Sequence, residues 1–101
     1  MLRFEWNLAK ATTNRKKHGV EFEDALFVFE DPYAIFEPDR PDESGDLRWH
    51  VIGTANGVAV LWVVHTVRPE GEDEVIRIIS ARQAARKERL IYEQNRSQDI
   101  G

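Results

Sequence analysis

The sequence predicts a single α+β domain with a small antiparallel sheet, in the form of a β-meander, two N-terminal helices and one C-terminal helix. Three observations lead to this prediction. Apolar residues recur at helical spacing in the first thirty residues, two β-rich runs flank Asn56 and Gly57, and helical spacing returns from residue 82 onward. The 101 residues, 42% of them hydrophobic, suffice for one core, so residues 1–101 are expected to form one domain.

The N-terminal third predicts one strand and two helices. Apolar and charged residues alternate over residues 2–6, as in a strand with one solvated face. Asn7 is a favourable N-cap and Gly19 a favourable C-terminal residue, so a helix is expected over residues 7–18. Residues 22–30 repeat the i, i+3, i+4, i+7 pattern of a second amphipathic helix, which an Asp-Pro pair then ends.

The centre of the chain predicts a β-hairpin. Asn56 and Gly57 stand between the β-rich runs 47–55 and 58–66, a pattern typical of a two-residue type I′ turn. Residues 58–64 are apolar on both faces, so the second strand should be central in the sheet and covered on both sides.

This turn also predicts a register. With Ala55 opposite Val58, Arg48 lies opposite His65, and His50 shares their face. The three side chains would form a polar cluster on an otherwise apolar sheet. An arginine repels a metal cation, so phosphate is the better ligand for such a cluster, unless the histidines are satisfied polar groups at a sheet edge.

The flanks of the hairpin predict the remaining elements. Residues 33–37 fit a short strand, and residues 38–46 are a polar loop. Residues 75–80 are rich in β-formers and predict a buried strand in which Arg77 is the one charge. A helix with a cationic face should follow this strand, over about residues 83–95.

The composition bounds the cellular setting. The chain has no cysteine, which suits a reducing cytosol. The longest apolar run, residues 58–64, has seven residues, far fewer than a membrane span needs, and the N-terminus has no signal-peptide pattern. We therefore expect a soluble, cytoplasmic protein that does not contact a membrane.

Charge is segregated along the chain, although the net charge is only −4. Residues 1–20 carry +4 and residues 76–101 carry +3, whereas residues 21–46 carry −9 and residues 47–75 carry −2. If the two basic ends meet in space, their surface can hold an anionic polymer despite the overall sign. The alternative is that these charges are ordinary solvated helix faces.

His18 is the residue we expect to transfer protons. It falls in the last turn of the first predicted helix, beside Lys16 and Lys17. A histidine that caps the helix carbonyls is the alternative, and the sequence favours neither. The chain contains no Gly-rich phosphate loop, no HExxH and no GxSxG motif.

Five segments in order resemble the BrnT family of bacterial toxins: FEWN at 4–7, KHGVEFEDA at 17–25, VFEDP at 28–32, Arg48 followed by IG at 52–53, and RIISARQAARKER at 77–89. The resemblance implies a RelE-like α+β fold and a ribonuclease that stops translation by cutting RNA without a metal. It also implies a silencing partner, a BrnA-type antitoxin with a ribbon-helix-helix DNA-binding domain.

Metal-free RNA cleavage requires proton transfer and stabilisation of the phosphorane charge. Arginine makes bidentate contacts to phosphate and keeps its charge, which suits the second task. The expected catalytic residues are His18, Arg48, Arg77 and Arg82, and the expected RNA-binding residues are Lys16, Lys17, Arg68 and Arg86. No metal ligand or cofactor is expected. The end of the first helix and residues 80–82 should form one site. The acidic residues 37–46 should not be part of it because carboxylates repel phosphate, and they should lie away from the basic helices or face the basic part of an antitoxin.

Two other classes of function fit the same sequence. A non-catalytic nucleic-acid-binding module would use the basic segments without His18. A protein-interaction module would use the acidic residues 21–46 and the apolar sheet face. The expected partners are RNA and the antitoxin, with a homodimer or a higher toxin–antitoxin assembly as further forms.

Overall fold

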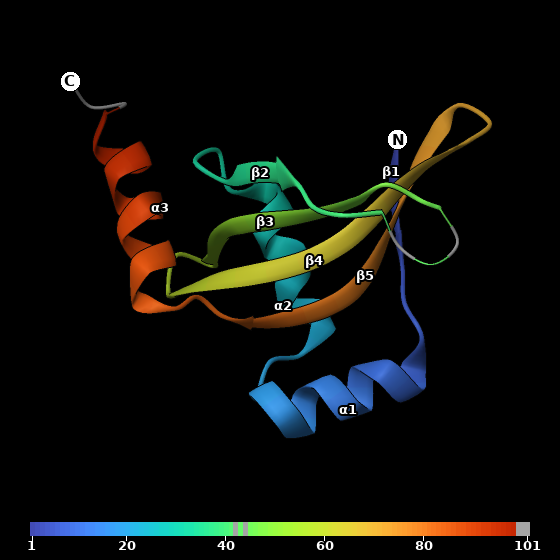
Figure 1. Ribbon diagram of the computed structural model, residues 1–101, viewed down its shortest axis with the longest axis horizontal. Coiled ribbons are helices and arrows are strands. Elements are labelled where there is room, and N and C mark those ends of the chain that lie inside the picture. Colours follow the sequence, from blue (N-terminus) through green and yellow to red (C-terminus); the bar gives the residue numbers. More distant parts are fainter. Residues whose placement is uncertain (42, 44, 99–101) are drawn as a thin grey trace.

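The computed structural model describes residues 1–41, 43 and 45–98, which form one mixed five-stranded sheet with helices on one face and at two of its borders (Figure 1). The elements in chain order are β1 (Leu2–Glu5), α1 (Leu8–His18), α2 (Phe22–Ala25), the 3-10 helix η1 (Leu26–Glu30), β2 (Ile35–Pro38), β3 (Arg48–Ala55), β4 (Ala59–Glu70), β5 (Asp73–Gln83) and α3 (Arg86–Gln98). None of the helices in the described part of the chain is long and apolar enough to cross a lipid bilayer.

The strand order is β1-β5-β4-β3-β2, and the expectation of a purely antiparallel sheet is wrong. The meander β2 to β5 is antiparallel, but β1 pairs with β5 in parallel, with Leu2 opposite Glu74 and Glu5 opposite Arg77. Most of the chain separates β1 from β5, so no turn fixes their relative direction. Local sequence patterns therefore carry no information on that pairing.

The hairpin forms, but its register differs by one residue from the prediction. Asn56 and Gly57 have the positive φ angles of a type I′ turn, 57° and 71°, and Val58 N–H donates to the Ala55 carbonyl at 3.2 Å. Val58 nevertheless stays outside the ladder, and Ala55 lies opposite Ala59. The turn type was predicted correctly, whereas the extra loop residue was missed.

The one-residue shift places His65 opposite Trp49, and Arg48 opposite Thr66. Because neighbouring residues of a strand point to opposite faces, His65 lies on the other face from Arg48 and His50. The predicted cluster of these three side chains is therefore wrong.

The first helix agrees with the prediction at both ends. Asn7 Oδ1 accepts a hydrogen bond from the Lys10 amide at 3.0 Å, and Gly19 adopts the left-handed conformation with φ 71°. The second predicted helix is shorter than expected, because α2 is followed directly by the tighter turns of η1.

The last helix starts later than predicted. The long strand β4 provides a partner for β5 as far as Gln83, which lies opposite Leu61, so β5 does not end at Ser80. Arg82 is consequently a strand residue opposite Trp62, and α3 begins only at Arg86. Cross-strand pairing outweighs the helical preference of the Ala-rich segment here.

The helical layer covers one face of the sheet. In Figure 1, α2 lies behind the strands, α1 lies beside β5, and α3 stands at the end of the sheet near the β3–β4 turn. The core lies between α2, η1 and the sheet and contains Val20, Phe22, Ala25, Val28, Val51, Leu61, Val63, Ile76, Ile78 and Ala81. The central strand β4 was expected to be covered on both sides by helices or by a partner, and in the described part of the chain α2 and η1 cover one of its faces.

Two polar side chains fix the helices to the sheet. The buried Asn14 side chain accepts from the Ala81 amide at 3.1 Å and donates to the Ala81 carbonyl at 2.8 Å, which attaches α1 to the border of β5. The Asp31 carboxylate accepts from the Tyr33 amide, from the amide and hydroxyl of Thr54, and from the Tyr92 hydroxyl at 2.7 Å. Asp31 thus joins η1, β3 and α3.

We expect Tyr92→Phe to lower the free energy of unfolding at pH 7 by about 1.5 kcal/mol, because it removes a hydrogen bond to a charged group. Burial opposes ionisation of Asp31, but the bonds from Thr54, Tyr92 and Tyr33 outweigh it and lower its pKa below 3.8. The loss should therefore be full above pH 3.8 and shrink as the pH falls and Asp31 is protonated.

Urea unfolding across this pH range measures the effect. Tyr33→Phe is the matched control, because the Tyr33 hydroxyl has no hydrogen bond within the described residues and its ring contact with Arg96, at 5.6 Å, is retained. Equal losses for the two variants would contradict the proposed role of Asp31.

Candidate functional site

The face of the sheet opposite α2 and η1, called the open face below, carries most of the charged side chains of the strands. Cross-strand register places the residues of this face in four rows that run across the strands and follow one another along β4: Arg68–Val75, Arg48–Thr66–Arg77, His50–Val64–Ser80 and Ile52–Trp62–Arg82. The outermost rows are six residues apart on β4, or about 20 Å. Four arginines expected in the site from sequence thus share one face.

Arg68 and Arg77 are held by one carboxylate. Glu5, on the neighbouring strand β1, accepts two hydrogen bonds from Arg68 at 3.0 and 3.1 Å and one from Arg77 at 2.7 Å. These bonds lower the pKa of the Glu5 carboxyl from 4.5 to about 2, so it stays ionised at neutral pH. The pairing orients both guanidinium groups and leaves more than a third of each exposed.

Arg82 is fixed by α3 and by an aromatic ring. Its guanidinium donates to both carboxylate oxygens of Glu88, at 2.8 and 2.9 Å, and lies 4.8 Å from the centre of the Trp62 ring. Glu88 also accepts from the Ala85 amide at 2.7 Å, at the start of α3. The hydrogen bonds from Arg82 and Ala85 lower the pKa of Glu88 against the effect of burial.

His50 stacks on the same tryptophan. The His50 and Trp62 rings are 4.0 Å apart with an interplanar angle of 14°. The imidazole nitrogens lie 3.7 Å from Glu37 and 3.7 Å from Asp39. Two acids of the 37–46 segment therefore adjoin the open face, against the expectation that this segment lies away from it; residues 42 and 44 of the segment are outside the described residues.

His18 borders the open face from the side. It ends α1 and lines a hollow of about 230 Å³ together with Lys17 and Ser80, among others. Ser80 points to the open face, between the rows of Arg77 and Arg82. The structure therefore brings Lys17, His18 and Ser80 together, as predicted, while Arg82 does not line this hollow.

The other predicted RNA-binding residues lie further out. Lys16 is exposed in the last turn of α1, and Arg86 is exposed at the first position of α3. Lys16 is on α1, which lies beside β5, and Arg86 is on α3, which stands at the end of the sheet near the β3–β4 turn (Figure 1).

Sequence reasoning missed three residues of this site. Trp62 was counted as one of a run of apolar residues, so its contacts with His50 and Arg82 were not foreseen. Glu5 pairs with Arg77, which is far from it in sequence, and Glu88 of α3 pairs with Arg82 of β5. Ser80 was among the predicted site residues, although it was taken as the end of a strand that in fact continues to Gln83. Only the correct register would have revealed these contacts.

We expect Glu5→Gln to lower the free energy of unfolding at pH 7 by about 1 kcal/mol, a modest loss because the three side chains are partly exposed. The pKa of Glu5 is about 2 in the folded protein against 4.5 ordinarily. The stabilisation is therefore present above pH 4.5 and is lost as the pH falls towards 2.

Chemical unfolding between neutral pH and pH 2 tests this. Glu93→Gln makes the same change of charge on α3, where Glu93 has no ion pair within the described residues, and should have little effect. A difference between wild type and Glu5→Gln that did not depend on pH would rule out the ion pairs of Glu5 as its cause.

Comparisons with known proteins show the family of the chain. A family model described as the ribonuclease toxin BrnT of type II toxin–antitoxin systems matches residues 6–88. The crystal structure of the Brucella abortus ribonuclease toxin BrnT is similar, with a TM-score of 0.64 and 28% identity, over 85% of this chain and 100% of that one. A comparison with curated proteins found no match. The chain belongs to the BrnT family of ribonuclease toxins of type II toxin–antitoxin systems.

Proposed function

We propose that this BrnT-family toxin is a metal-independent endoribonuclease whose active site is the open face of the sheet. The observation that supports this most strongly is the alignment of Arg48, Arg68, Arg77 and Arg82 on the face opposite α2 and η1, which α3 reaches only at the row of Ile52, Trp62 and Arg82. Such a strip of fixed cations suits a single RNA strand, because each guanidinium can contact one phosphate through two hydrogen bonds.

Arg48 and Arg77 are proposed to stabilise the phosphorane. They belong to one cross-strand row, with Thr66 between them, at the middle of the strip. Charge that develops on the non-bridging oxygens during attack by the 2′-oxygen would be shared between the two guanidinium groups. Arg82 would hold an adjacent phosphate, with Lys16, Lys17, Arg68 and Arg86 on flanking ones.

His18 is proposed to transfer a proton. Cleavage requires that the 2′-hydroxyl loses a proton, that the bond from phosphorus to the 5′-oxygen breaks, and that this oxygen gains a proton. His18 lies at the border of the open face beside Ser80. His50 is the second candidate, because it lies on the open face itself, two residues along β3 from Arg48, with two carboxylates 3.7 Å from its ring nitrogens.

The proposed partner is a BrnA-type antitoxin that silences the toxin by binding it. The family is defined by type II toxin–antitoxin systems, in which a protein antitoxin accompanies the toxin. A RelE-like architecture and a cytoplasmic location are consistent with this proposal.

We expect His18→Ala to lower the rate of RNA cleavage by about 10²- to 10⁴-fold, the usual effect of removing a general acid or base, while RNA binding survives. The measurement is single-turnover cleavage of a labelled RNA by antitoxin-free protein in EDTA, with folding checked by circular dichroism. His50→Ala is the matched variant. If the rate falls for His50→Ala and not for a folded His18→Ala protein, proton transfer belongs to His50.

Cleavage that requires a divalent metal would overturn metal independence. Absence of cleavage under all conditions, with RNA still bound, would favour the non-catalytic nucleic-acid-binding module.

Arg82→Ala should weaken both RNA binding and cleavage, and Arg82→Lys should not restore them. Lysine carries the same charge, but it lacks the planar guanidinium group with which Arg82 donates to both Glu88 oxygens and lies over the Trp62 ring. Filter binding and single-turnover rates measure the two effects. Arg89→Ala, which removes an exposed arginine from α3, is the control and should stay near wild type. Full rescue by lysine would show that charge alone is needed at this position.

A further inference from the structure

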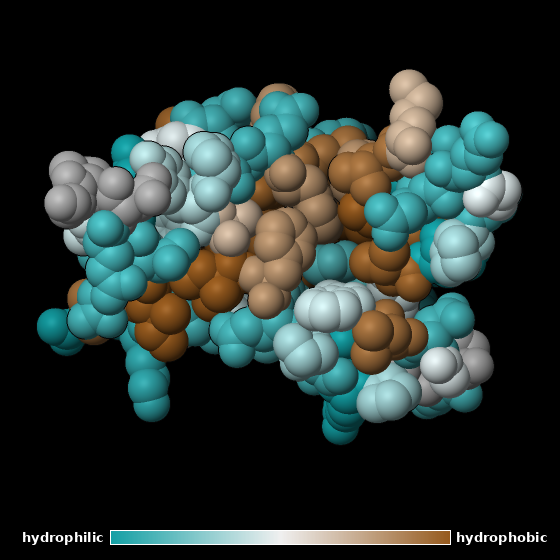
Figure 2. Space-filling model, turned by 90° about the horizontal axis from the view of Figure 1, so that it is seen from above, coloured by the Kyte–Doolittle hydropathy of each residue, from teal (hydrophilic) through white to brown (hydrophobic). Residues whose placement is uncertain are grey.

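The face of the sheet that carries the core has an open pocket at the end where β1 and β2 lie. The helical layer formed by α2 and η1 is too short to cover this end of the sheet. A pocket of about 380 Å³ remains, lined by Leu2, Phe29, Phe36, Trp49, His65, Val67, Glu74 and Ile76. Figure 2, which looks down on the molecule from the side of β2 and the N-terminus, shows a hollowed band of hydrophobic side chains bordered by hydrophilic ones.

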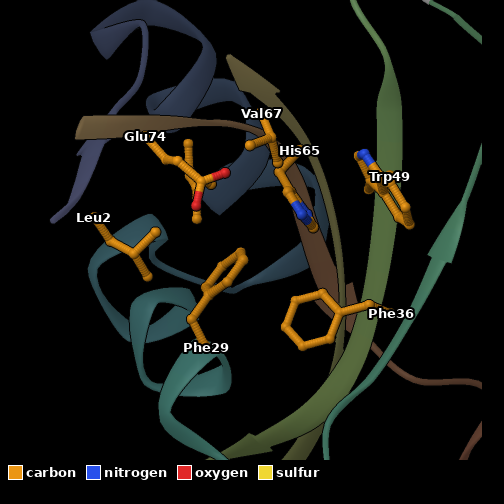
Figure 3. A pocket seen from close by; sticks show the side chains of 8 residues that line it. Leu2, Phe29, Phe36, Trp49, His65, Val67 and Glu74 are labelled. Carbon is orange, nitrogen blue, oxygen red and sulfur yellow. The ribbon is translucent and has the colours of Figure 1, made fainter. Parts of the chain in front are cut away.

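Aromatic rings form one wall of this pocket. The Phe29 and His65 rings are 4.9 Å apart at 79°, the Phe36 and His65 rings are 6.2 Å apart at 90°, and the two phenylalanines are 6.0 Å apart. Trp49 lies opposite His65 on the neighbouring strand. Figure 3 shows these four rings around one space, with Leu2 and the carboxylate of Glu74 across from them.

Two polar groups at this pocket lack partners, one buried in its wall and one on its surface. The His65 side chain is 2% exposed, and its Nδ1 has no hydrogen-bond partner among the described residues. Burial lowers the pKa of His65 to about 4, so the ring is neutral at neutral pH and does not repel a cation. The carboxylate of Glu74 makes no hydrogen bond or ion pair within the described part of the chain. No lysine or arginine of that part lines the pocket.

This combination fits a guanidinium group. Aromatic faces and an unpaired carboxylate attract a planar cation, and the aliphatic side chains of Leu2, Val67 and Ile76 suit the methylene stem of an arginine. An RNA phosphate does not fit, because Glu74 repels it. Phe36 and Leu2, at 48% and 51% exposed, extend the apolar surface to the rim. That rim favours an arginine within an apolar protein segment over a free cation.

We propose that this pocket takes an arginine side chain of the antitoxin, whose apolar neighbours pack on Leu2 and Phe36. This inference rests on the proposed silencing by an antitoxin. The pocket lies on the opposite face of the sheet from the arginine rows, so the contact anchors the antitoxin and does not itself block the RNA site. Glu74 is the residue that selects a basic side chain.

Isothermal titration calorimetry with the purified cognate antitoxin tests the anchor. Glu74→Gln keeps the shape of the side chain and removes its charge, and it should weaken antitoxin binding about 10-fold. Glu72→Gln, in the exposed turn just before β5, removes an equal charge outside the pocket and should leave the affinity within about twofold of wild type. Wild-type affinity for Glu74→Gln, or equal losses for both variants, would overturn the proposal.

A second measurement tests the chemistry of the occupant. The probe is the acetylated and amidated pentapeptide Ala-Leu-Arg-Leu-Ala, titrated into antitoxin-free protein and followed by the amide chemical shifts of Leu2, Val67 and Ile76. The same peptide with neutral citrulline in place of arginine should bind about fivefold more weakly, and Glu74→Gln should remove this difference. Equal binding of the two peptides to wild type, or no shifts at these residues, would overturn the proposal.

Two controls distinguish an antitoxin anchor from a role of the pocket in catalysis or in self-association. RNA cleavage by antitoxin-free Glu74→Gln protein should equal that of wild type. If no variant cleaves RNA, the ribonuclease proposal fails, but the calorimetric comparison still decides the anchor. Self-association of the antitoxin-free protein that Glu74→Gln abolishes, with unchanged antitoxin affinity, would assign the pocket to a second copy of the chain and overturn the proposal.

Discussion

The carboxylate of Asp31 is the interaction on which the geometry of the open face depends. It accepts hydrogen bonds from Tyr33, from the amide and hydroxyl of Thr54 on β3, and from Tyr92 on α3. The bond to Tyr92 fixes α3 at the end of the sheet, and α3 in turn supplies Glu88. Glu88 holds Arg82 over Trp62. A carboxylate at the end of η1 thus determines where an arginine on the far side of the sheet points.

The helical layer is small for the sheet that it covers, and both candidate surfaces follow from this. α2 and η1 together cover the middle of one face, and the other face, which α3 reaches only at the row of Arg82, carries the arginine rows. At the β1 and β2 end even the covered face is incomplete, which leaves the pocket around Phe36 and His65. A second full helix over the sheet would have buried more apolar area but would have removed one of the two surfaces.

Carboxylates orient the arginines of the open face in the free protein. Glu5 orients Arg68 and Arg77, and Glu88 orients Arg82, so in the proposed RNA complex little side-chain entropy would remain to be lost when a phosphate binds. The same pairing reduces the positive potential of the free protein, whose net charge is −4. In that proposed complex phosphate would compete with these carboxylates, which would favour an RNA that contacts several arginines at once over a single isolated anion.

The sequence by itself determined the elements with strong local signals, and tertiary contacts decided the rest. Asn7, Gly19 and the Asn56–Gly57 pair fix α1 and the hairpin turn, because capping and positive φ depend on the residues themselves. The arginines of the site could be named from their chemistry. Their common face, however, depends on a register that one extra loop residue changes, and the extension of β5 through Arg82 depends on the length of β4. The parallel pairing of β1, the pairing of Glu5 with Arg77 and the pocket around His65 join residues far apart in the chain, so no local pattern could specify them.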